Sequence, residues 1–175
     1  VFQLLLAGAL SLAANAADLD LGNRAPAPGP RTIIHPSQTL ARLRQGGDTI
    51  ADAFVVPGIP FEDVGTTVGF ANDYDAVCPY TGSIAPDVVY AYTPAASVVV
   101  DIDLCGSGYD TKLYVLDANL ILLACNDDYY TVDPCGLYVS KLRAVALEAG
   151  QPVYVVIDGY GDSAGDYQLR MTVWT

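Results

Sequence analysis

The clearest folding signal in this chain is the stretch Ser97-Val-Val-Val-Asp-Ile-Asp-Leu-Cys-Gly-Ser-Gly-Tyr-Asp-Thr111. In its first half Val100, Ile102 and Leu104 fall on one face, while Asp101 and Asp103 fall on the other. A two-residue period of this kind is typical of a β-strand with one buried face. The Cys-Gly-Ser-Gly that follows is turn chemistry. The stretch therefore predicts a strand that ends in a turn.

The same period returns from Gly46 onward, and no part of this region sustains a helical period. Turn segments such as Glu148-Ala-Gly-Gln-Pro152 separate the candidate strands. Beyond the Ser97–Leu104 strand, we expect strands at Thr66–Phe70, Val88–Tyr92, Thr111–Leu116, Leu120–Cys125, Lys141–Leu147, Val153–Ile157 and Tyr167–Val173. Short strands at this spacing predict an all-β fold, a jelly-roll-type antiparallel β-sandwich over residues 46–175.

The acidic residues of this chain are unevenly distributed. From Gly46 onward there are 18 acidic residues and four basic ones, a net charge of −14. Nearly all the acids are Asp, which favours turns between strands. Such a surface repels nucleic acid and attracts cations, so we expect no nucleic-acid partner.

The N-terminal residues predict export. Residues 1–16 have an apolar run followed by Ala14-Asn-Ala16, as in a signal peptide, here truncated at its start. The alternative is a buried core helix. The run is too short for a membrane span. Residues 17–45 contain Arg24-Ala-Pro-Ala-Pro-Gly-Pro-Arg31 and predict an irregular, Pro-rich linker. We therefore expect a secreted or cell-surface protein.

Export permits disulfide bonds among the four cysteines, Cys78, Cys105, Cys125 and Cys135. Four cysteines allow three pairings. If the segment between Cys105 and Cys125 is one hairpin, these two are bonded, which leaves Cys78 for Cys135. A zinc site is disfavoured, because there is no C-x-x-C pair and the only histidine, His35, precedes the domain.

Several segments resemble the bacterial pre-peptidase C-terminal domain. They are Asp87-Val-Val-Tyr-Ala-Tyr92, Cys105-Gly-Ser-Gly-Tyr-Asp-Thr-Lys-Leu-Tyr114, Ala124-Cys-Asn-Asp-Asp128, and Ala149-Gly-Gln-Pro-Val-Tyr-Val-Val-Ile-Asp-Gly-Tyr-Gly161 followed by Gly165-Asp-Tyr-Gln-Leu169. The resemblance implies a jelly-roll sandwich appended to secreted proteins, often proteases. Its collagen-binding relatives use calcium and a tyrosine-bearing face.

Two clusters of Asp and Asn are candidate calcium sites, because calcium takes six to eight oxygen ligands. In the first cluster, Asn72, Asp73 and Asp87 resemble calcium-binding positions of the collagen-binding relatives, and Asp75 lies beside them. The alternative is that these side chains only make turns and start a strand.

The second cluster contains Asp110, Asn126, Asp127 and Asp128, which a Cys105–Cys125 bond brings together. Several close carboxylates repel one another and need a cation or a set of N–H donors. Turns satisfied by backbone N–H groups are the alternative here.

Four tyrosines lie in predicted turns, Tyr109, Tyr129, Tyr130 and Tyr160. Exposed rings beside polar loops suit stacking on sugars or an extended peptide, so we expect a ligand-binding face there. The alternative is that the rings fold over the ends of the sandwich. Without a histidine the domain cannot form a Ser–His–Asp or Cys–His arrangement, so we expect no enzyme.

These observations predict a secreted, monomeric, calcium-stabilised accessory domain for adhesion or binding to an extracellular polymer, protein or glycan. One alternative is a spacer or maturation module of an exported protein that has no ligand. A jelly-roll glycoside hydrolase is the third and weakest, since it needs two facing carboxyls that the sequence does not single out.

Overall fold

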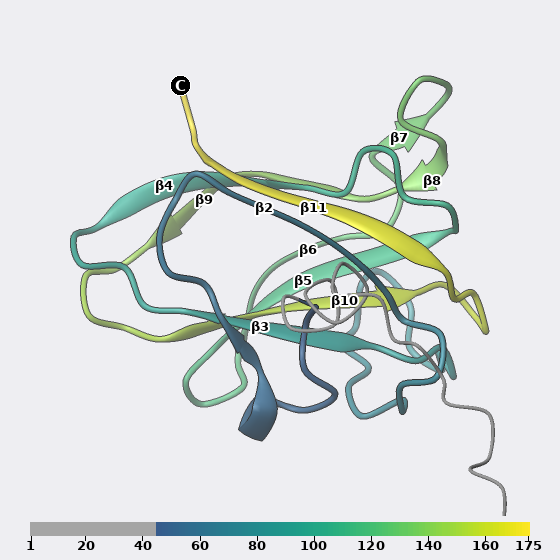
Figure 1. Ribbon diagram of the computed structural model, residues 1–175, viewed down its shortest axis with the longest axis horizontal. Coiled ribbons are helices and arrows are strands. Elements are labelled where there is room, and N and C mark those ends of the chain that lie inside the picture. Colours follow the sequence, from purple (N-terminus) through teal and green to yellow (C-terminus); the bar gives the residue numbers. More distant parts are fainter. Residues whose placement is uncertain (1–44) are drawn as a thin grey trace, which may run out of the picture. The chain divides into compact units, whose positions relative to one another are not determined.

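The computed structural model describes residues 45–175 as a sandwich of two β-sheets (Figure 1). One sheet has the strand order β1-β3-β10-β5-β6, and the other has the order β2-β11-β4-β9. Their strands are β1 (Phe54–Val55), β3 (Val88–Tyr92), β10 (Val153–Gly159), β5 (Thr111–Asp117), β6 (Leu122–Asn126), β2 (Phe61–Thr66), β11 (Asp166–Val173), β4 (Val98–Asp103) and β9 (Lys141–Leu147). A separate pair, β7 (Tyr130–Thr131) with β8 (Leu137–Val139), and one 3-10 turn, η1 (Ile50–Asp52), complete the described part. This confirms the predicted all-β sandwich.

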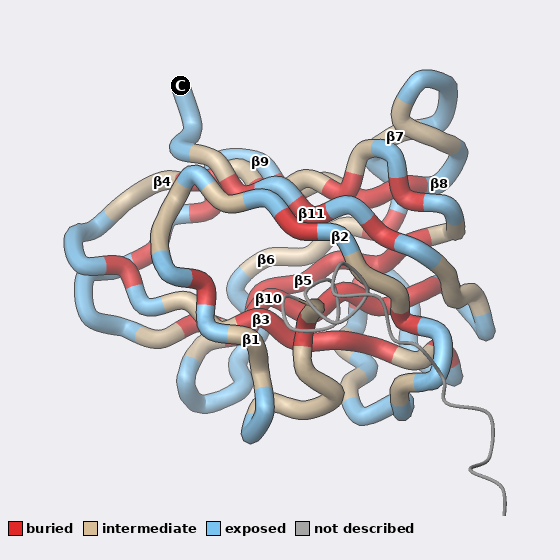
Figure 2. Tube along the Cα trace, viewed as in Figure 1, coloured by how far each residue is buried: buried red, intermediate tan, exposed pale blue. Residues whose placement is uncertain are grey.

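The apolar faces of the two sheets meet in one core (Figure 2). The alternating residues of β4 behave as predicted, because Val100, Ile102 and Leu104 are fully buried. A polar chain crosses this core, in which Tyr167 donates to the Tyr90 hydroxyl at 2.7 Å and Tyr90 donates to Asp63 at 3.1 Å. These buried hydroxyls are therefore satisfied, as buried polar groups must be.

The expected strand at Thr66–Phe70 is wrong. The strand there is β2, which ends at Thr66, and Phe70 then donates its N–H to the Thr67 carbonyl in a turn. The apolar pattern gave the wrong bounds because β2 turns a polar residue inward and an apolar one outward. Val64 is exposed, whereas Asp63 is buried and accepts a hydrogen bond from Tyr90. By contrast, β3 and β9 have the predicted bounds.

The predicted disulfide pairing is also wrong. All four cysteines are bonded, but as Cys78–Cys125 and Cys105–Cys135. The hairpin in this region is β5–β6, with Tyr114 opposite Cys125, and Cys105 precedes it. Cys105 follows β4, which belongs to the other sheet, and it is bonded to Cys135, which lies shortly before β8.

The predicted signal peptide and nearly all of the predicted linker lie outside the described residues. Within residues 45–175, no helix has the length and apolar character required to cross a membrane.

Candidate functional site

Three aspartates, Asp110, Asp127 and Asp128, converge at one end of the β5–β6 hairpin. Asp110 directly precedes β5, and the other two directly follow β6. The antiparallel register places Leu113 opposite Asn126, so the start of one strand lies beside the end of the other. Ligand oxygens of the three carboxylates lie within 4.8 Å of one another. The predicted convergence is therefore present, and the hairpin produces it without a Cys105–Cys125 bond.

The carboxylates of this cluster are poorly compensated. Asp127 is only 8% exposed, and the Oδ1 atoms of Asp110 and Asp127 are buried without a hydrogen-bond donor. Burial, with the charges of Asp128 and Asp127 added, raises the pKa of Asp110 to about 6. Burial and Asp128 raise the pKa of Asp127, although Lys112 acts in the opposite direction. Backbone-satisfied turns do not account for these two buried oxygens.

Neighbouring bonds hold the backbone of the cluster in place. The Ser140 hydroxyl donates to the Asp127 carbonyl at 2.6 Å, and the Tyr160 N–H donates to the Asp110 carbonyl at 3.1 Å. Asn126 belongs to the same end of the hairpin, but its Oδ1 accepts the Lys141 N–H at 3.1 Å. The predicted ligand Asn126 is thus engaged in joining β6 to β9.

In the first predicted cluster the carboxylates of Asp73, Asp75 and Asp87 do not form a group of three at ligating distance. Asn72 donates to the Ser83 carbonyl at 3.1 Å, and Asp87 accepts the N–H groups of Asp73 and Tyr74 at 2.9 and 3.0 Å. Asp75 accepts from Lys112 at 2.7 Å. Of the carboxylates in residues 45–175, only Asp110, Asp127 and Asp128 form a group of three at ligating distance. Backbone N–H groups satisfy Oδ2 of Asp87, but its Oδ1 is buried without a donor, so turns account for this cluster only in part.

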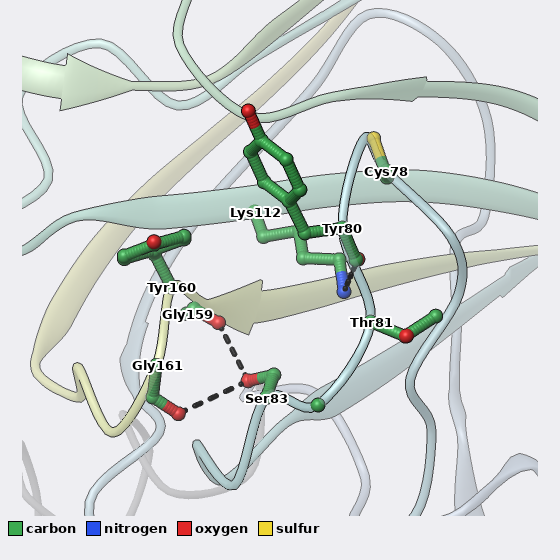
Figure 3. Close-up of a pocket in the computed structure, with 9 residues that line it drawn as sticks. Cys78, Tyr80, Thr81, Ser83, Lys112, Gly159, Tyr160 and Gly161 are labelled. Carbon is green, nitrogen blue, oxygen red and sulfur yellow. Dashed lines mark hydrogen bonds between the residues drawn. The ribbon is translucent and has the colours of Figure 1, made fainter.

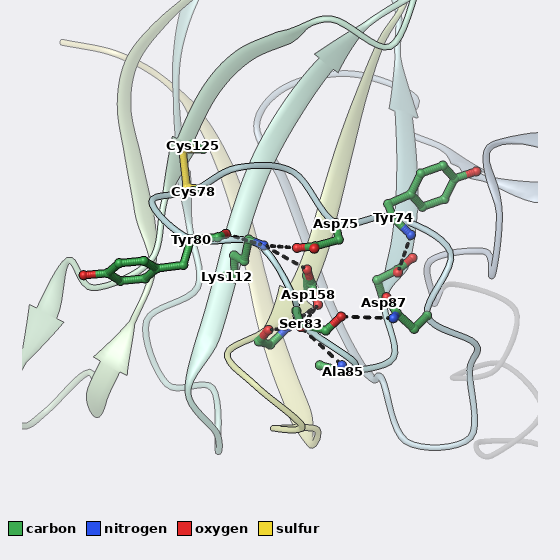
Figure 4. Close-up of polar contacts among 12 residues, drawn as sticks. Tyr74, Asp75, Cys78, Tyr80, Ser83, Ala85, Asp87, Lys112, Cys125 and Asp158 are labelled. Atoms are coloured by element: carbon green, nitrogen blue, oxygen red, sulfur yellow. Dashed lines mark hydrogen bonds and ion pairs between the residues drawn. A yellow bond between two sulfur atoms is a disulfide. The ribbon is translucent and has the colours of Figure 1, made fainter.

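Asp75 of the first cluster belongs to a charge network around the buried Lys112 that the sequence did not indicate (Figure 4). Lys112 lies on β5 directly opposite Asp158 on β10, and both are buried. The Lys112 ammonium is 2.7 Å from Asp75 and 3.7 Å from Asp158. Burial raises the pKa of Asp158 to about 7, although the Gly159 N–H and Lys112 act against it.

The loop between β2 and β3 makes this burial possible. On the outer face of the five-stranded sheet, Val89, Tyr114, Leu116 and Val156 form a second small core. Tyr74 and Ala76 of the loop pack against that core, and Cys78 ties the loop to Cys125 of β6. This sheet is therefore covered on both faces. The sequence signal that could have indicated it is the apolar character of both faces of β10, in which Val153, Val155, Val156 and Ile157 are all buried.

The four predicted ligand-binding tyrosines do not form one exposed face. Tyr109 packs on the main core with its hydroxyl buried, and Tyr130 also packs there and donates to Asp103 at 2.9 Å. These two side chains thus follow the alternative of rings folded into the sandwich. Tyr129 and Tyr160 are exposed, and only Tyr129 directly adjoins the aspartate cluster in sequence.

Comparison with known proteins gives a likeness of fold. No protein-family model and no curated protein matches the chain. Among solved structures, the chain is similar to the pre-peptidase C-terminal domain of a collagenase from Bacillus anthracis. The sequence identity is 15% and the TM-score 0.44, over 68% of this chain and 93% of that domain.

Proposed function

We propose that residues 46–175 form an extracellular, non-catalytic binding module, stabilised by Ca²⁺ at Asp110, Asp127 and Asp128. The observation that supports this most is the pair of buried Oδ1 atoms, on Asp110 and Asp127, that lack a donor. A buried carboxylate without a partner costs free energy, and a cation in the cluster offsets that cost.

The donor set suits a hard divalent cation. Three carboxylates offer oxygen ligands only, without sulfur or imidazole, and calcium takes six to eight oxygens in flexible geometry. Asp127 is buried and Asp128 is exposed, so water can supply the remaining ligands from the solvent side. The bound ion contributes positive charge that the cluster otherwise lacks.

Two further features support an extracellular, non-catalytic role. The domain has two disulfides. Disulfides persist in oxidising compartments and are rare in the cytosol. No histidine occurs after His35, so the sandwich lacks the base of the common nucleophilic triads. Adhesion to an extracellular polymer is favoured by Tyr129, an exposed ring next to Asp128.

Calcium titration tests the proposed metal site. We expect a heat of binding by calorimetry and a higher melting temperature in CaCl₂ than in EDTA. Binding to the folded state alone adds about 2.7 kcal/mol of stability at a hundredfold excess over Kd. Asp127→Asn should abolish this calcium effect. It should also leave the metal-free protein as stable or more stable, because it removes a buried charge.

Asp162→Asn is the matched control, because Asp162 is an exposed aspartate outside the cluster. It should keep the full response to calcium. Equal melting temperatures in CaCl₂ and EDTA for the unaltered protein would exclude the calcium site.

A further inference from the structure

A small pocket lies beside the buried charge network, and none of the three clustered aspartates lines it (Figure 3). Its volume is about 150 Å³, which corresponds to about five water molecules. Lys112 lies between Gly159–Tyr160 on one side and the loop that carries Tyr80 and Ser83 on the other. The pocket is therefore large enough for one ring-sized unit and too small for a folded partner.

The charges around the pocket favour an uncharged ligand. The Lys112 ammonium is neutralised by Asp75 at 2.7 Å and Asp158 at 3.7 Å, so an anion gains little there. A cation would lie against the same ammonium. The Lys112 ammonium also lies 3.5 Å from the Tyr80 carbonyl, so its three N–H groups already have three oxygen partners within the protein. The pocket therefore offers a ligand no uncompensated charge of either sign.

The rim of the pocket carries two exposed rings and two hydroxyl side chains. Tyr80 is 66% exposed and Tyr160 is 50% exposed, although apolar rings are usually better covered. Thr81 and Ser83 also belong to the lining. Rings of this kind stack on the C–H faces of a sugar, while side-chain hydroxyls bind its oxygens.

The pocket walls are held before any ligand arrives. The Ser83 hydroxyl donates to the Gly159 carbonyl at 2.8 Å, and the Gly82 N–H donates to Asp75 at 2.6 Å. Cys78, itself part of the lining, bonds the loop covalently to β6. A fixed wall reduces the entropy that a ligand must overcome on binding.

We propose that this pocket binds one neutral sugar unit of an extracellular glycan, stacked against Tyr80 and Tyr160 and hydrogen-bonded by Thr81. The inference rests on the proposed role as an extracellular binding module and names its ligand as a glycan instead of a protein.

Calorimetry on the full chain, with its disulfides intact, tests the sugar site. The neutral probes are tetrasaccharides of glucose, mannose, galactose and N-acetylglucosamine, and the comparators are tetragalacturonate and gelatin peptides. At least one neutral probe should bind, and Tyr80→Ala/Tyr160→Ala should weaken it at least about tenfold, as loss of stacked aromatic anchors does. Thr81→Val should weaken it several-fold.

Tyr138→Ala is the control, because Tyr138 is an exposed tyrosine outside the pocket lining, and it should bind as the unaltered protein does. Three results would overturn the inference: no binding of any neutral probe, equal binding by the Tyr80/Tyr160 variant, or preference for tetragalacturonate or gelatin peptides. Each titration is run in CaCl₂ and in EDTA. Failure of the metal site then shows as an unchanged melting temperature, independently of the sugar result.

Discussion

The buried charge of Lys112 is compensated by two aspartates, Asp75 and Asp158. The Lys112 side chain is 3% exposed, and of its two partners Asp158 lies across the sheet and Asp75 belongs to the covering loop. A buried ion pair adds little over an apolar replacement, but removal of one partner leaves an unpaired buried charge. The consequence of a substitution therefore depends on which partner remains.

The first prediction concerns this pair. Lys112→Met should destabilise the protein by about 3–5 kcal/mol above pH 8, where Asp158 is ionised and stays buried without its cation. The free energy of unfolding in urea measures this. Lys112→Met/Asp158→Asn should recover a substantial part of the loss, since no unpaired charge then remains at position 158. A double variant as unstable as the single one would contradict the pairing.

At the level of residues, the sequence revealed the aspartate cluster but missed the buried network. Asp127 and Asp128 are adjacent and end a recognisable strand, so local pattern sufficed to find them. Lys112 and Asp158 come together only through the register of β5 with β10, and Asp75 reaches them from an irregular loop. No local period carries that information. The sequence also could not predict which turn tyrosines are exposed. Tyr109 and Tyr129 both lie beside aspartates in turns, but only Tyr129 is exposed.

At the level of elements, the segment between β2 and β3 acts as a third layer without being a strand. It covers the outer face of the five-stranded sheet with Tyr74 and Ala76. Its covalent tie is the Cys78–Cys125 bond, which spans 47 residues. Closing a loop of that length restricts the unfolded chain by about 4 kcal/mol in the chain-entropy picture.

The second prediction concerns this tie. Peptide mapping of the oxidised protein should recover Cys78 with Cys125 and Cys105 with Cys135. Cys78→Ala/Cys125→Ala should lower the free energy of unfolding by about 4 kcal/mol. Hydrogen exchange should then rise first in the covering loop and least in β10. A peptide that joins Cys105 to Cys125 would contradict the structure.

The elements that the sequence located best are strands with one or both faces apolar. Lys141–Leu147 and Val88–Tyr92 were located to the residue. β2 was misplaced because it buries Asp63, whose polarity is satisfied by Tyr90 on the neighbouring sheet. β1 and β7 contain two residues each, too few for a period to register.

At the level of the whole molecule, buried acids oppose the fold at neutral pH. Burial raises the pKa of Asp87 and Asp110 to about 6 and that of Asp158 to about 7, from an ordinary value of 3.8. A carboxyl with a raised pKa favours the folded state when protonated. Its contribution is complete below pH 3.8 and is lost as the pH rises through 6 to 7. Asp52 and Asp75 have lowered pKa values, and their opposite contribution is lost only in more acidic solution.

The third prediction follows from these directions. In EDTA, the melting temperature should be higher at pH 5 than at pH 8, because Asp87, Asp110 and Asp158 must ionise in the folded state over that range. Calorimetric melts across this range measure the slope. Asp87→Asn should flatten it, since one of the three groups no longer titrates. Stability that rises from pH 5 to pH 8 in EDTA would contradict these assignments.

The positions of the terminal strands and disulfides also determine how the domain responds to mechanical load. β2 and β11 are antiparallel neighbours, with Phe61 beside Met171, so the chain enters and leaves this pair at one end. Tension applied at the Phe61 end of β2 and the Val173 end of β11 breaks the hydrogen bonds between the two strands one after another. The force is then transmitted through the Cys78–Cys125 bond and bypasses the 47-residue segment between the two cysteines. That segment contains β3, β4 and β5. Pulling therefore lengthens the outer segments of the sandwich but cannot extend the span that contains Asp110 and Lys112.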